Sequence, residues 1–277
     1  FDAICVRSAT KVRQDLIDAC PDLKFIGRGG VGMDNIDVDY ARSKGVAVHN
    51  TPAASSRSVA ELAFAHLLSM ARSVYQSNRQ MPINGNSEFG SLKKSYSKGV
   101  ELEGKTLGII GLGRIGVESA KIGYGLGMKV VGVDPYVKGS KDFEWSIADH
   151  SVSASIPSIS MDDMLSQSDF ITMHIPFTGD AVLGHQEFSK MKKGVYLVDA
   201  ARGGTIDEDA LLEALNNDTV AAAGLDVFVG EPTPRQDLLS HPRISLTPHI
   251  GASTAEAQEK IGTELAGYII EVFNNLK

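Results

Sequence analysis

Short apolar runs alternate with amphipathic segments along most of the chain. Runs of four to six apolar and β-branched residues are typical of buried strands, and apolar positions spaced three or four apart are typical of helices. The runs predict strands at residues 3–6, 23–26, 46–48, 106–110, 128–133, 170–175, 195–200, 221–227 and 244–246. Alternation of such strands with helices predicts βαβ units and parallel sheets.

The intervening segments predict helices at residues 12–19, 37–44, 58–72, 117–126, 161–166, 207–216 and 254–275. The helix at 58–72 is expected to begin at Ser58, with Glu61 completing a capping box, and His66 on its apolar face is interpreted as a packed core histidine. Residues 76–100 are polar and are expected to form a loop or extended arm. Residues 139–160 have little pattern and predict a loop with one short strand.

A glycine motif follows the strand at 106–110. Gly111, Gly113 and Gly116 form G-x-G-x-x-G, with Arg114 and Ile115 inside it, and a helical segment comes next. This order is the one the dinucleotide-binding fingerprint requires: a tight turn, a close approach to pyrophosphate, and close packing of helix on strand. The helix N-terminus then offers N–H groups to phosphates. We therefore expect residues 111–116 to bind a dinucleotide.

An acid follows at the expected distance. Asp134 ends the next strand, 18 residues after Gly116. A carboxylate there accepts hydrogen bonds from the ribose hydroxyls and repels a 2′-phosphate, so NAD is favoured over NADP as the cofactor. The fold class is accordingly expected to be α/β with doubly wound parallel sheets, in which a Rossmann-type NAD domain, residues 52–251, is inserted into a smaller flavodoxin-like substrate domain, residues 1–51 and 252–277.

A second glycine-rich turn lies at residues 27–32. The strand that follows it ends in His49 and Asn50, with no acid in the position of Asp134. We interpret Gly29, Gly30 and Val31 as a nest of backbone N–H groups for a small anion such as a carboxylate. A plain strand-to-helix turn is the alternative.

The composition describes an ordinary globular protein, with 43% hydrophobic and 22% charged residues. A formal net charge of −7 without a basic stripe argues against a nucleic-acid partner. Cys5 and Cys20 have no metal-ligand spacing and are interpreted as free thiols in a reducing compartment, and no metal is expected. The chain has no apolar run of about 18 residues, so no membrane span is expected, and the expected location is cytoplasmic.

Candidate catalytic groups follow the later strands. Arg202 comes after one strand, Asp226 and Glu231 lie around another, and His249 follows the last. Ligands collect at the carboxyl ends of strands in open α/β sheets. Oxidation of a hydroxy acid requires a base for the alcohol proton, which histidine suits, a carboxylate to fix its tautomer, and a cation for the substrate carboxylate.

With these residues in order, the sequence resembles the D-2-hydroxyacid dehydrogenase family, and most of all its members that oxidise D-3-phosphoglycerate. The resemblance rests on residues 6–12, 26–37, 107–116, 201–204, 225–232 and 247–254, which are spread in family order along nearly the whole chain. It implies that His249 exchanges the proton, that Glu231 is its partner and that Arg202 anchors the substrate.

The resemblance also assigns binding residues. NAD is expected on Gly111, Gly113, Arg114, Ile115, Gly116 and Asp134, with help from Ile175, Ala200, Ala201, Asp226 and Gly251. Asp226 would hold the nicotinamide carboxamide. The substrate carboxylate is expected on Gly29, Gly30 and Val31, with Arg202 and His249, while Arg7 and Arg28 face its phosphate. A homodimer built on residues 58–72 and 76–100 is expected by the same analogy.

Three departures from the family pattern qualify this interpretation. An opening βα segment is expected before Phe1, and Asp199 stands where the family is expected to have Asn. The sequence ends at Lys277, and a short form without a C-terminal regulatory domain, and hence without feedback by serine, is expected. Two alternatives stay open: a sister enzyme for glyoxylate, hydroxypyruvate or D-lactate, and an NAD-sensing binding protein of the corepressor kind.

Overall fold

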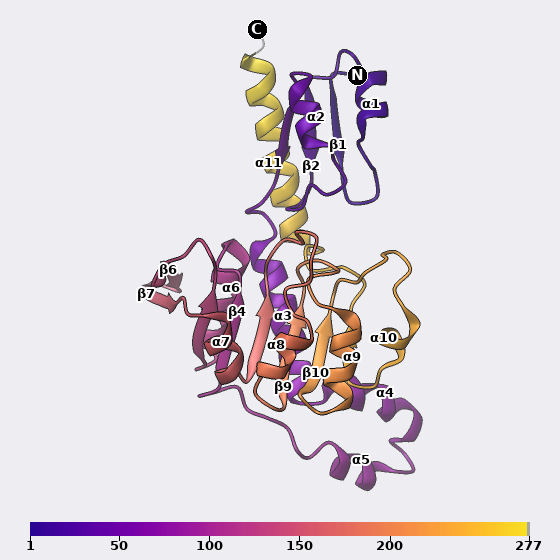
Figure 1. The fold of residues 1–277 in the computed structure, drawn as a ribbon, viewed down its shortest axis with the longest axis vertical. Helices are drawn as coiled ribbons and strands as arrows, with labels where there is room; N and C mark the ends of the chain where they lie inside the picture. Colours follow the sequence, from indigo (N-terminus) through magenta and orange to yellow (C-terminus); the bar gives the residue numbers. More distant parts are fainter. Residues whose placement is uncertain (276–277) are drawn as a thin grey trace. The chain divides into compact units, whose positions relative to one another are not determined.

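The computed structural model describes residues 1–275, which separate into two compact units (Figure 1). One unit comprises residues 1–58 and the described part of 252–277, and the other comprises residues 59–251. The sequence predicts the first boundary seven residues earlier, at 52. The intervening segment is a turn that bonds to itself, since Ser56 donates to the Pro52 carbonyl and Ser58 to the Ser55 carbonyl.

The first unit contains a three-stranded parallel sheet in the order β1-β2-β3. Its elements are β1 (Ala3–Val6), α1 (Gln14–Ala19), β2 (Phe25–Arg28), α2 (Val38–Ser43), β3 (Ala47–Asn50) and α11 (Ala255–Asn275). Helix α11 packs on the sheet through Ile261 and Leu265, which come within 3.2 Å and 3.0 Å of where a β-carbon on Gly29 and Gly27 would lie. Glycine at these two positions lets the helix approach the strand closely.

The second unit is built on a six-stranded parallel sheet in the order β11-β10-β9-β8-β4-β5. Its strands are β4 (Thr106–Ile110), β5 (Lys129–Val133), β8 (Phe170–Met173), β9 (Val195–Asp199), β10 (Val220–Leu225) and β11 (Ile244–Leu246). Its helices are α3 (Ser56–Ala71, entering from the boundary), α4 (Val74–Asn84), α5 (Phe89–Ser95), α6 (Arg114–Gly125), α7 (Met161–Gln167), α8 (His185–Lys190), α9 (Glu208–Asn216) and α10 (Gln236–Ser240).

Each face of this sheet has its own core. Successive strand residues point to opposite faces, and neighbouring residues accordingly enter different apolar clusters: Ile109 joins one and Ile110 the other, as do Val198 and Leu197. The chain order reverses between β4 and β8, the point at which doubly wound sheets bind ligands. The predicted fold class is confirmed for this unit by its sheet.

Two segments expected to be irregular are regular. Residues 139–160 form an antiparallel hairpin of β6 (Ser140–Ile147) and β7 (His150–Pro157), which continues the edge of β5 through a bridge between Gly132 and Ser158. The expected arm at 76–100 contains α4 and α5, which Figure 1 shows beyond one end of the sheet. Helix α3 begins at Ser56, so the predicted cap at Ser58 is wrong.

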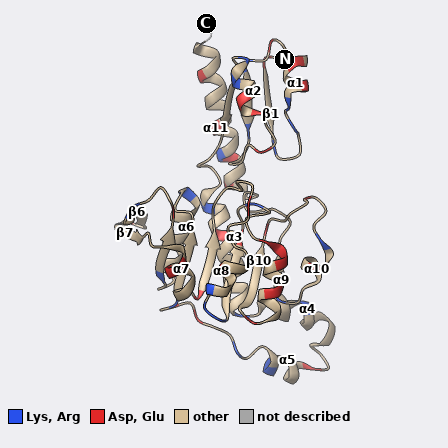
Figure 2. Ribbon diagram, in the orientation of Figure 1, with Lys and Arg blue, Asp and Glu red and all other residues tan. Residues whose placement is uncertain are grey.

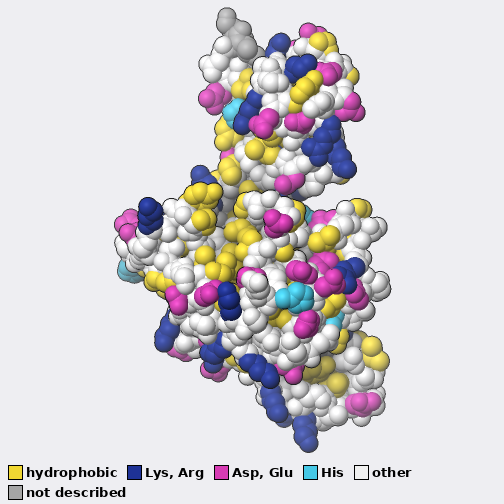
Figure 3. All heavy atoms as spheres, in the orientation of Figure 1, with side chains coloured by type: hydrophobic (Ala, Val, Ile, Leu, Met, Phe, Trp, Pro, Cys, Tyr) yellow, Lys and Arg dark blue, Asp and Glu magenta, His cyan; other side chains and the backbone are white. Residues whose placement is uncertain are grey.

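Charged side chains are distributed without a basic stripe in the ribbon of Figure 2, where acidic residues gather on α9. The face in Figure 3 likewise has basic and acidic side chains interspersed. Within residues 1–275, no helix has the length and apolar character needed to cross a membrane.

Candidate active site

The candidate residues of the second unit lie at the carboxyl edge of its sheet. Because all six strands are parallel, their carboxyl ends meet at one edge. In sheet order, the residues that follow the strands are His249 (after β11), Asp226 (β10), Arg202 (β9), His174 (β8), Gly111 (β4) and Asp134 (β5). The sheet therefore brings the predicted catalytic and cofactor residues of this unit to one edge.

The glycine motif forms the turn between β4 and α6. Gly111 has φ +95°, and a β-carbon on it would lie 2.6 Å from the His174 carbonyl and 2.8 Å from Ile175. A β-carbon on Gly116 would lie 2.0 Å from the Gly111 carbonyl oxygen. These two glycines are therefore required for packing within the protein. Gly113 differs, because a β-carbon on it would meet no atom within 4 Å, and it precedes Arg114 and Ile115 in the first turn of α6.

Asp134 closes the same turn from the neighbouring strand. One carboxylate oxygen accepts from the Leu112 N–H at 2.8 Å, and the other accepts from the Tyr136 N–H at 2.9 Å. The carboxylate is thereby fixed beside the glycine turn. A carboxylate offers about four lone-pair positions, so acceptor capacity remains for ribose hydroxyls.

His174 is a residue of this turn that the sequence analysis missed. Its Nε2 lies 2.8 Å from the Ser119 hydroxyl of α6 and 3.1 Å from the Thr172 hydroxyl. Complete burial lowers its pKa to about 3. The imidazole is therefore neutral and ties β8 to the helix that begins at the glycine turn. A His-Ile-Pro at a strand end gives no signal of burial, which depends on the helix packed above it.

The turn after β9 carries Arg202. Ala200 and Ala201 are buried, and one Arg202 Nη donates to the Ala201 carbonyl at 2.6 Å, so the guanidinium folds back on its own turn. Asp199 underlies this turn: its carboxylate accepts from the Ala201 N–H at 2.8 Å and from the Thr205 hydroxyl at 2.6 Å. Burial raises the pKa of Asp199 to about 6 despite these donors.

Asp226 holds the loop that carries His249. Its carboxylate is 1% exposed and accepts from the Thr247 hydroxyl at 2.6 Å and from the N–H groups of Ile250 and Gly251 at 2.8 and 2.9 Å. Three of its roughly four acceptor positions are thus taken within the protein. In this conformation Asp226 holds the chain on both sides of His249, through the Thr247 side chain before it and backbone N–H groups after it.

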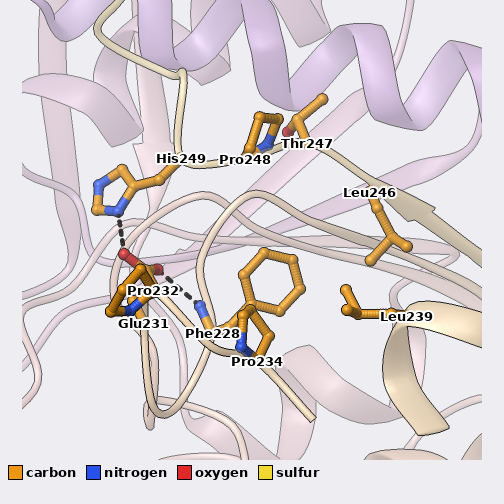
Figure 4. Close-up of a pocket in the computed structure, with 9 residues that line it drawn as sticks. All are labelled: Phe228, Glu231, Pro232, Pro234, Leu239, Leu246, Thr247, Pro248 and His249. Carbon is orange, nitrogen blue, oxygen red and sulfur yellow. Dashed lines mark hydrogen bonds and ion pairs between the residues drawn. The ribbon is translucent and has the colours of Figure 1, made fainter. Parts of the chain in front are cut away.

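Glu231 and His249 form a hydrogen-bonded pair (Figure 4). The His249 Nδ1 lies 2.7 Å from one Glu231 carboxylate oxygen, and the other oxygen accepts from the Phe228 N–H at 2.9 Å. The carboxylate only accepts, so Nδ1 carries the hydrogen and Nε2 of the neutral ring carries a lone pair. His249 has φ +54°, a left-handed conformation that is uncommon for residues other than glycine. The pair has the geometry of a base and its orienting acid.

His66 extends this network into the core. Thr247 gives its one hydroxyl hydrogen to Asp226, so the His66 Nε2, 3.0 Å from that hydroxyl oxygen, must donate to it. The His66 Nδ1 then accepts from the Ser245 hydroxyl at 2.9 Å. Burial lowers the pKa of His66, consistent with this neutral tautomer. The prediction of a packed core histidine is confirmed, and the ring also fixes the hydroxyl that binds Asp226.

A cavity of about 430 Å³ lies beside the Glu231–His249 pair. Its walls are mainly apolar, and Figure 4 shows the residues that line it: Phe228, Glu231, Pro232, Pro234, Leu239, Leu246, Thr247, Pro248 and His249. The two catalytic candidates thus border on a space of low polarity, in which a charge–charge contact is screened less than in water.

The glycine turn of the first unit departs from the expected anion nest. The Gly29 N–H donates to the Val6 carbonyl at 2.9 Å, and the Gly30 N–H donates to the Thr51 hydroxyl at 2.8 Å. Two of the three expected donors therefore bond within the protein, and the expectation that Gly29 and Gly30 offer N–H groups to a carboxylate is wrong for this conformation. Val31 is partly exposed at the surface of the turn.

The two arginines of this unit differ in their surroundings. The Arg28 guanidinium lies over Gly30, donating to the Gly29 carbonyl and to the Ser8 hydroxyl at 3.1 Å. Arg7 is exposed, and its carbonyl accepts from the Asn35 side chain at 2.8 Å. Arg28 is therefore a cation held on the glycine turn by its own neighbours.

Comparison with known proteins identifies the family. Residues 64–251 match the family described as D-isomer specific 2-hydroxyacid dehydrogenase, NAD binding domain. The chain belongs to the D-2-hydroxyacid dehydrogenases. It is 44% identical over 275 residues to hydroxypyruvate reductase of Thermotoga maritima, covering 98% of this chain and 84% of the relative. It is 42% identical over 273 residues to D-3-phosphoglycerate dehydrogenase of Methanocaldococcus jannaschii, covering 98% of this chain and 49% of that protein. The chain thus spans about half the length of this dehydrogenase.

Solved structures agree with this assignment. D-Lactate dehydrogenase of Aquifex aeolicus, complexed with NAD and lactic acid, has a TM-score of 0.78 and 30% identity, covering 99% of this chain and 83% of that one. D-2-Hydroxyisocaproate dehydrogenase has a TM-score of 0.84 and 26% identity, covering 100% and 84%. The predicted family, two-domain Rossmann-type fold and enzyme class are confirmed.

The cofactor of this family domain is NAD, and the site has features that fit it. The open space at Gly113 leaves the backbone accessible where a pyrophosphate would approach, directly before the N-terminus of the 12-residue helix α6. Asp134 stands at the end of the adjacent strand with its carboxylate already oriented. The predicted cofactor is therefore confirmed at the level of the domain, whereas the contacts of individual residues remain predictions.

Proposed function

We propose that this protein oxidises D-3-phosphoglycerate to 3-phosphohydroxypyruvate with NAD, the entry step of serine biosynthesis. The observation that carries the dehydrogenase chemistry is the 2.7 Å hydrogen bond between His249 Nδ1 and Glu231 at the carboxyl edge of the sheet. It leaves Nε2 as the acceptor that an alcohol proton requires. The phosphorylated substrate is inferred from Arg7 and Arg28.

The proposed reaction divides between proton and hydride. His249 takes the hydroxyl proton at Nε2, and Glu231 stabilises the imidazolium that forms. Bound NAD supplies the acceptor for the hydride that leaves the substrate carbon. Arg202 binds the substrate carboxylate with charge-assisted hydrogen bonds and polarises the forming carbonyl. Asp226 supports the step indirectly, because it fixes the loop on which His249 lies.

The substrate side is proposed to involve the first unit. Arg28 is a cation already ordered on the glycine turn, which lowers the entropic cost of binding a phosphate dianion. The Val31 N–H binds the substrate carboxylate, for which the Gly29 and Gly30 N–H groups are not available. Arg7 adds a second positive charge for the phosphate. Lactate-type substrates carry no phosphate for these arginines to neutralise.

A second candidate is the reduction of hydroxypyruvate or glyoxylate. Two observations favour it: the relative at 44% identity is a hydroxypyruvate reductase, and the Arg28 guanidinium donates within the protein rather than being wholly available to a ligand. The same His249–Glu231 pair serves the reverse direction, in which His249 gives its proton to the carbonyl oxygen. The two candidates differ only in whether a phosphate is recognised.

The deciding experiment measures NADH formation with D-3-phosphoglycerate, D-glycerate and D-lactate in parallel, and NADH consumption with hydroxypyruvate. The variant Arg28→Ala is expected to lower kcat/KM at least 10-fold for the phosphorylated acid and less than 3-fold for glycerate, since a charge-assisted pair contributes about 1.5–3 kcal/mol. Arg42→Ala, an exposed charge loss in the same unit, is the matched control and should change neither.

Other outcomes separate the alternatives. Equal losses for phosphorylated and plain acids in Arg28→Ala would remove the phosphate argument and favour the reductase. Turnover of none of these substrates, with NAD still bound, would favour the NAD-sensing binding protein. A cytoplasmic location remains a prediction.

We also propose a homodimer through α3, α4 and α5. Large apolar side chains are exposed on these helices: Leu68, Val74, Met81, Ile83 and Phe89. Scattered single residues of this kind are ordinary, but a group on consecutive helices marks an association surface. Light scattering is expected to give twice the chain mass, and Ile83→Asp should shift it to the monomer. A monomeric parent protein would contradict the proposal.

A further inference from the structure

Asp199 occupies an unusual place for an ionisable group. It is the last residue of β9, where its strand partners are Met173 of β8 and Leu225 of β10, and it is 3% exposed. The turn that carries Arg202 starts directly after it. A buried carboxyl in this position is enclosed by strands on both sides and can hydrogen-bond to the turn that follows it.

The hydrogen bonds beneath the turn compete for one hydrogen. The Thr205 hydroxyl oxygen lies 2.6 Å from Asp199 Oδ2 and 2.8 Å from the Arg202 carbonyl oxygen. A hydroxyl has a single hydrogen to donate. If Asp199 is ionised, its carboxylate and the Arg202 carbonyl are both acceptors only. The Thr205 hydrogen that bonds to the carboxylate is then not available to the Arg202 carbonyl.

A proton on Asp199 removes this competition. The protonated carboxyl donates its O–H to Thr205, and the Thr205 hydroxyl is then free to donate to the Arg202 carbonyl. The other carboxyl oxygen continues to accept from the Ala201 N–H. One proton thus converts two competing acceptors into a continuous chain from Asp199 through Thr205 to Arg202.

We propose that Asp199 is a proton-linked positioning residue, which sets how firmly the Arg202 turn is held and hence how tightly the substrate carboxylate binds. The proposal rests on the proposed role of Arg202 as substrate anchor. The protonated carboxyl gives the tighter turn. The ionised carboxylate leaves the Arg202 carbonyl poorly bonded, with a Thr205 N–H at 3.3 Å, and adds a negative charge that attracts Arg202 and repels the substrate.

Burial and the groups around Asp199 together set its titration. Arg202 on its own turn favours the carboxylate through its backbone N–H and its positive charge. From β10, Asp226 donates its N–H to the Asp199 carbonyl at 2.9 Å, while its carboxylate is engaged by the His249 loop. From β8, His174 is neutral. Burial outweighs the favourable groups and raises the pKa of Asp199 to about 6.

The experiment uses Asp199→Asn in the full chain. The asparagine amide donates to Thr205 as the protonated carboxyl does, and its oxygen still accepts from Ala201. We expect the substrate KM of the parent enzyme to rise 3- to 10-fold between pH 5 and 7.5, whereas in Asp199→Asn it stays at the low value across this range. Measuring KM separately from kcat distinguishes an effect on substrate binding from an effect on proton transfer by His249.

Two further variants test the route through the hydroxyl. Thr205→Ser keeps the hydroxyl and is expected to retain the KM profile of the parent. Thr205→Val removes it and should abolish at least half of the pH effect, leaving only the part due to charge. Carboxyl infrared difference spectra, parent minus Asp199→Asn, are expected to show one titrating band near pH 6, which a merely structural Asp199 would lack.

The outcomes distinguish a failure of the proposed role of Asp199 from a failure of the proposed role of Arg202 as substrate anchor. If Arg202→Gln leaves KM unchanged, Arg202 is not the anchor and the proposed function fails. If Arg202→Gln raises KM but the profile of Asp199→Asn matches the parent, only the role of Asp199 is overturned. A flat KM in the parent enzyme from pH 5 to 7.5 would overturn it as well.

Discussion

The two glycine-rich turns of this protein look alike in sequence and differ in construction. Each follows a parallel strand, β4 in one case and β2 in the other. The turn after β4 leads at once into the 12-residue helix α6, whereas the turn after β2 leads into bends, and the next helix, α2, begins only at Val38. The first turn therefore ends in unpaired helix N–H groups, and the second does not.

The N–H groups of the second turn are used internally. Thr51 accepts from Gly30 and Val6 accepts from Gly29, so backbone groups that resemble an anion nest hold the turn itself. In the first turn, Asp134 fixes the Leu112 N–H and the surface at Gly113 stays open. The number of glycines in a turn thus says little about ligand binding. Whether a helix follows the turn, and whether its N–H groups are already bonded within the protein, decides whether it can bind an anion.

The largest expected change in NAD binding comes from adding one methyl group to the first turn. Gly116→Ala places a β-carbon 2.0 Å from the Gly111 carbonyl oxygen, so α6 must move. We expect NAD affinity to fall more than 100-fold and the unit to lose about 1–3 kcal/mol of stability from overpacking. Isothermal titration with NAD and thermal unfolding measure the two effects.

Gly113→Ala is the matched control within the same motif. Its β-carbon meets no protein atom within 4 Å, so the free protein should unfold at an unchanged temperature while NAD affinity falls about 10-fold. Unchanged NAD affinity in Gly113→Ala would show that the open backbone at this turn is not the phosphate site.

The next effect is a pH dependence of stability that is expected at the first turn and not at the second. Burial lowers the pKa of His174 to about 3, so the unfolded chain binds a proton below pH 6.5 that the folded protein refuses. The contribution of neutral His174 to folding stability is therefore fully present above about pH 6.5 and is lost as pH falls toward 3, by an amount on the order of 5 kcal/mol. The protection of backbone amides in β4 and β8 against hydrogen exchange, compared with that in β2 as the pH falls, measures this loss.

His174→Gln supplies the comparison for that measurement. The amide does not titrate in this range, so its variant should show a flatter loss of protection in β4 and β8 on acidification, although it starts from a lower stability. Equal acid slopes in the parent and in His174→Gln would mean that His174 is not the source of the effect.

The smallest expected effect concerns the second turn. Thr51→Val keeps the shape of the fully buried Thr51 and removes the acceptor of the Gly30 N–H. An unsatisfied buried N–H costs about 1–3 kcal/mol, which should reduce the protection of β2 against hydrogen exchange. NAD affinity is expected to stay within a factor of two. A larger change in NAD affinity would contradict the independence of the two turns.

Elements with a strong local pattern could be predicted from the sequence. The strand–glycine–helix unit around Gly111 and the acid at Asp134 are both local features, and the structure places them at adjacent strands. The apolar runs likewise predicted the succession of strands along the chain and the positions of Arg202, Asp226 and His249 at strand ends. The resemblance to the family supplied the pairing of Glu231 with His249, because nothing local links residues 18 apart.

Elements that depend on tertiary packing were missed. The hairpin of β6 and β7 has alternating apolar residues, including Phe143 and Trp145, but its turn lies at Ala148 and has no glycine. Helices α4 and α5 are polar, and α4 contains Pro82, so propensity argued against them. The burial of His174 requires knowledge of Ser119, which lies on a different element.

The use of N–H groups in the second turn was missed for a related reason. Whether Gly29 and Gly30 are free depends on Val6 and Thr51, which are distant in sequence and arrive through the sheet. Sequence reasoning identified a turn able to form a nest, and the pairing of its donors decided otherwise. The departure at Asp199, in contrast, was visible in the sequence, and its meaning became clear only with Thr205 in place.

The composition of the first unit from both ends of the chain has a consequence for synthesis on the ribosome. Strands β1 to β3 are made before residues 59–251, but α11, which covers them with Ile261 and Leu265, is made after those residues. The contiguous second unit can acquire its structure while the first still waits for its last helix. A chain that ends at Gly251 should therefore bind NAD while its N-terminal strands remain open to protease.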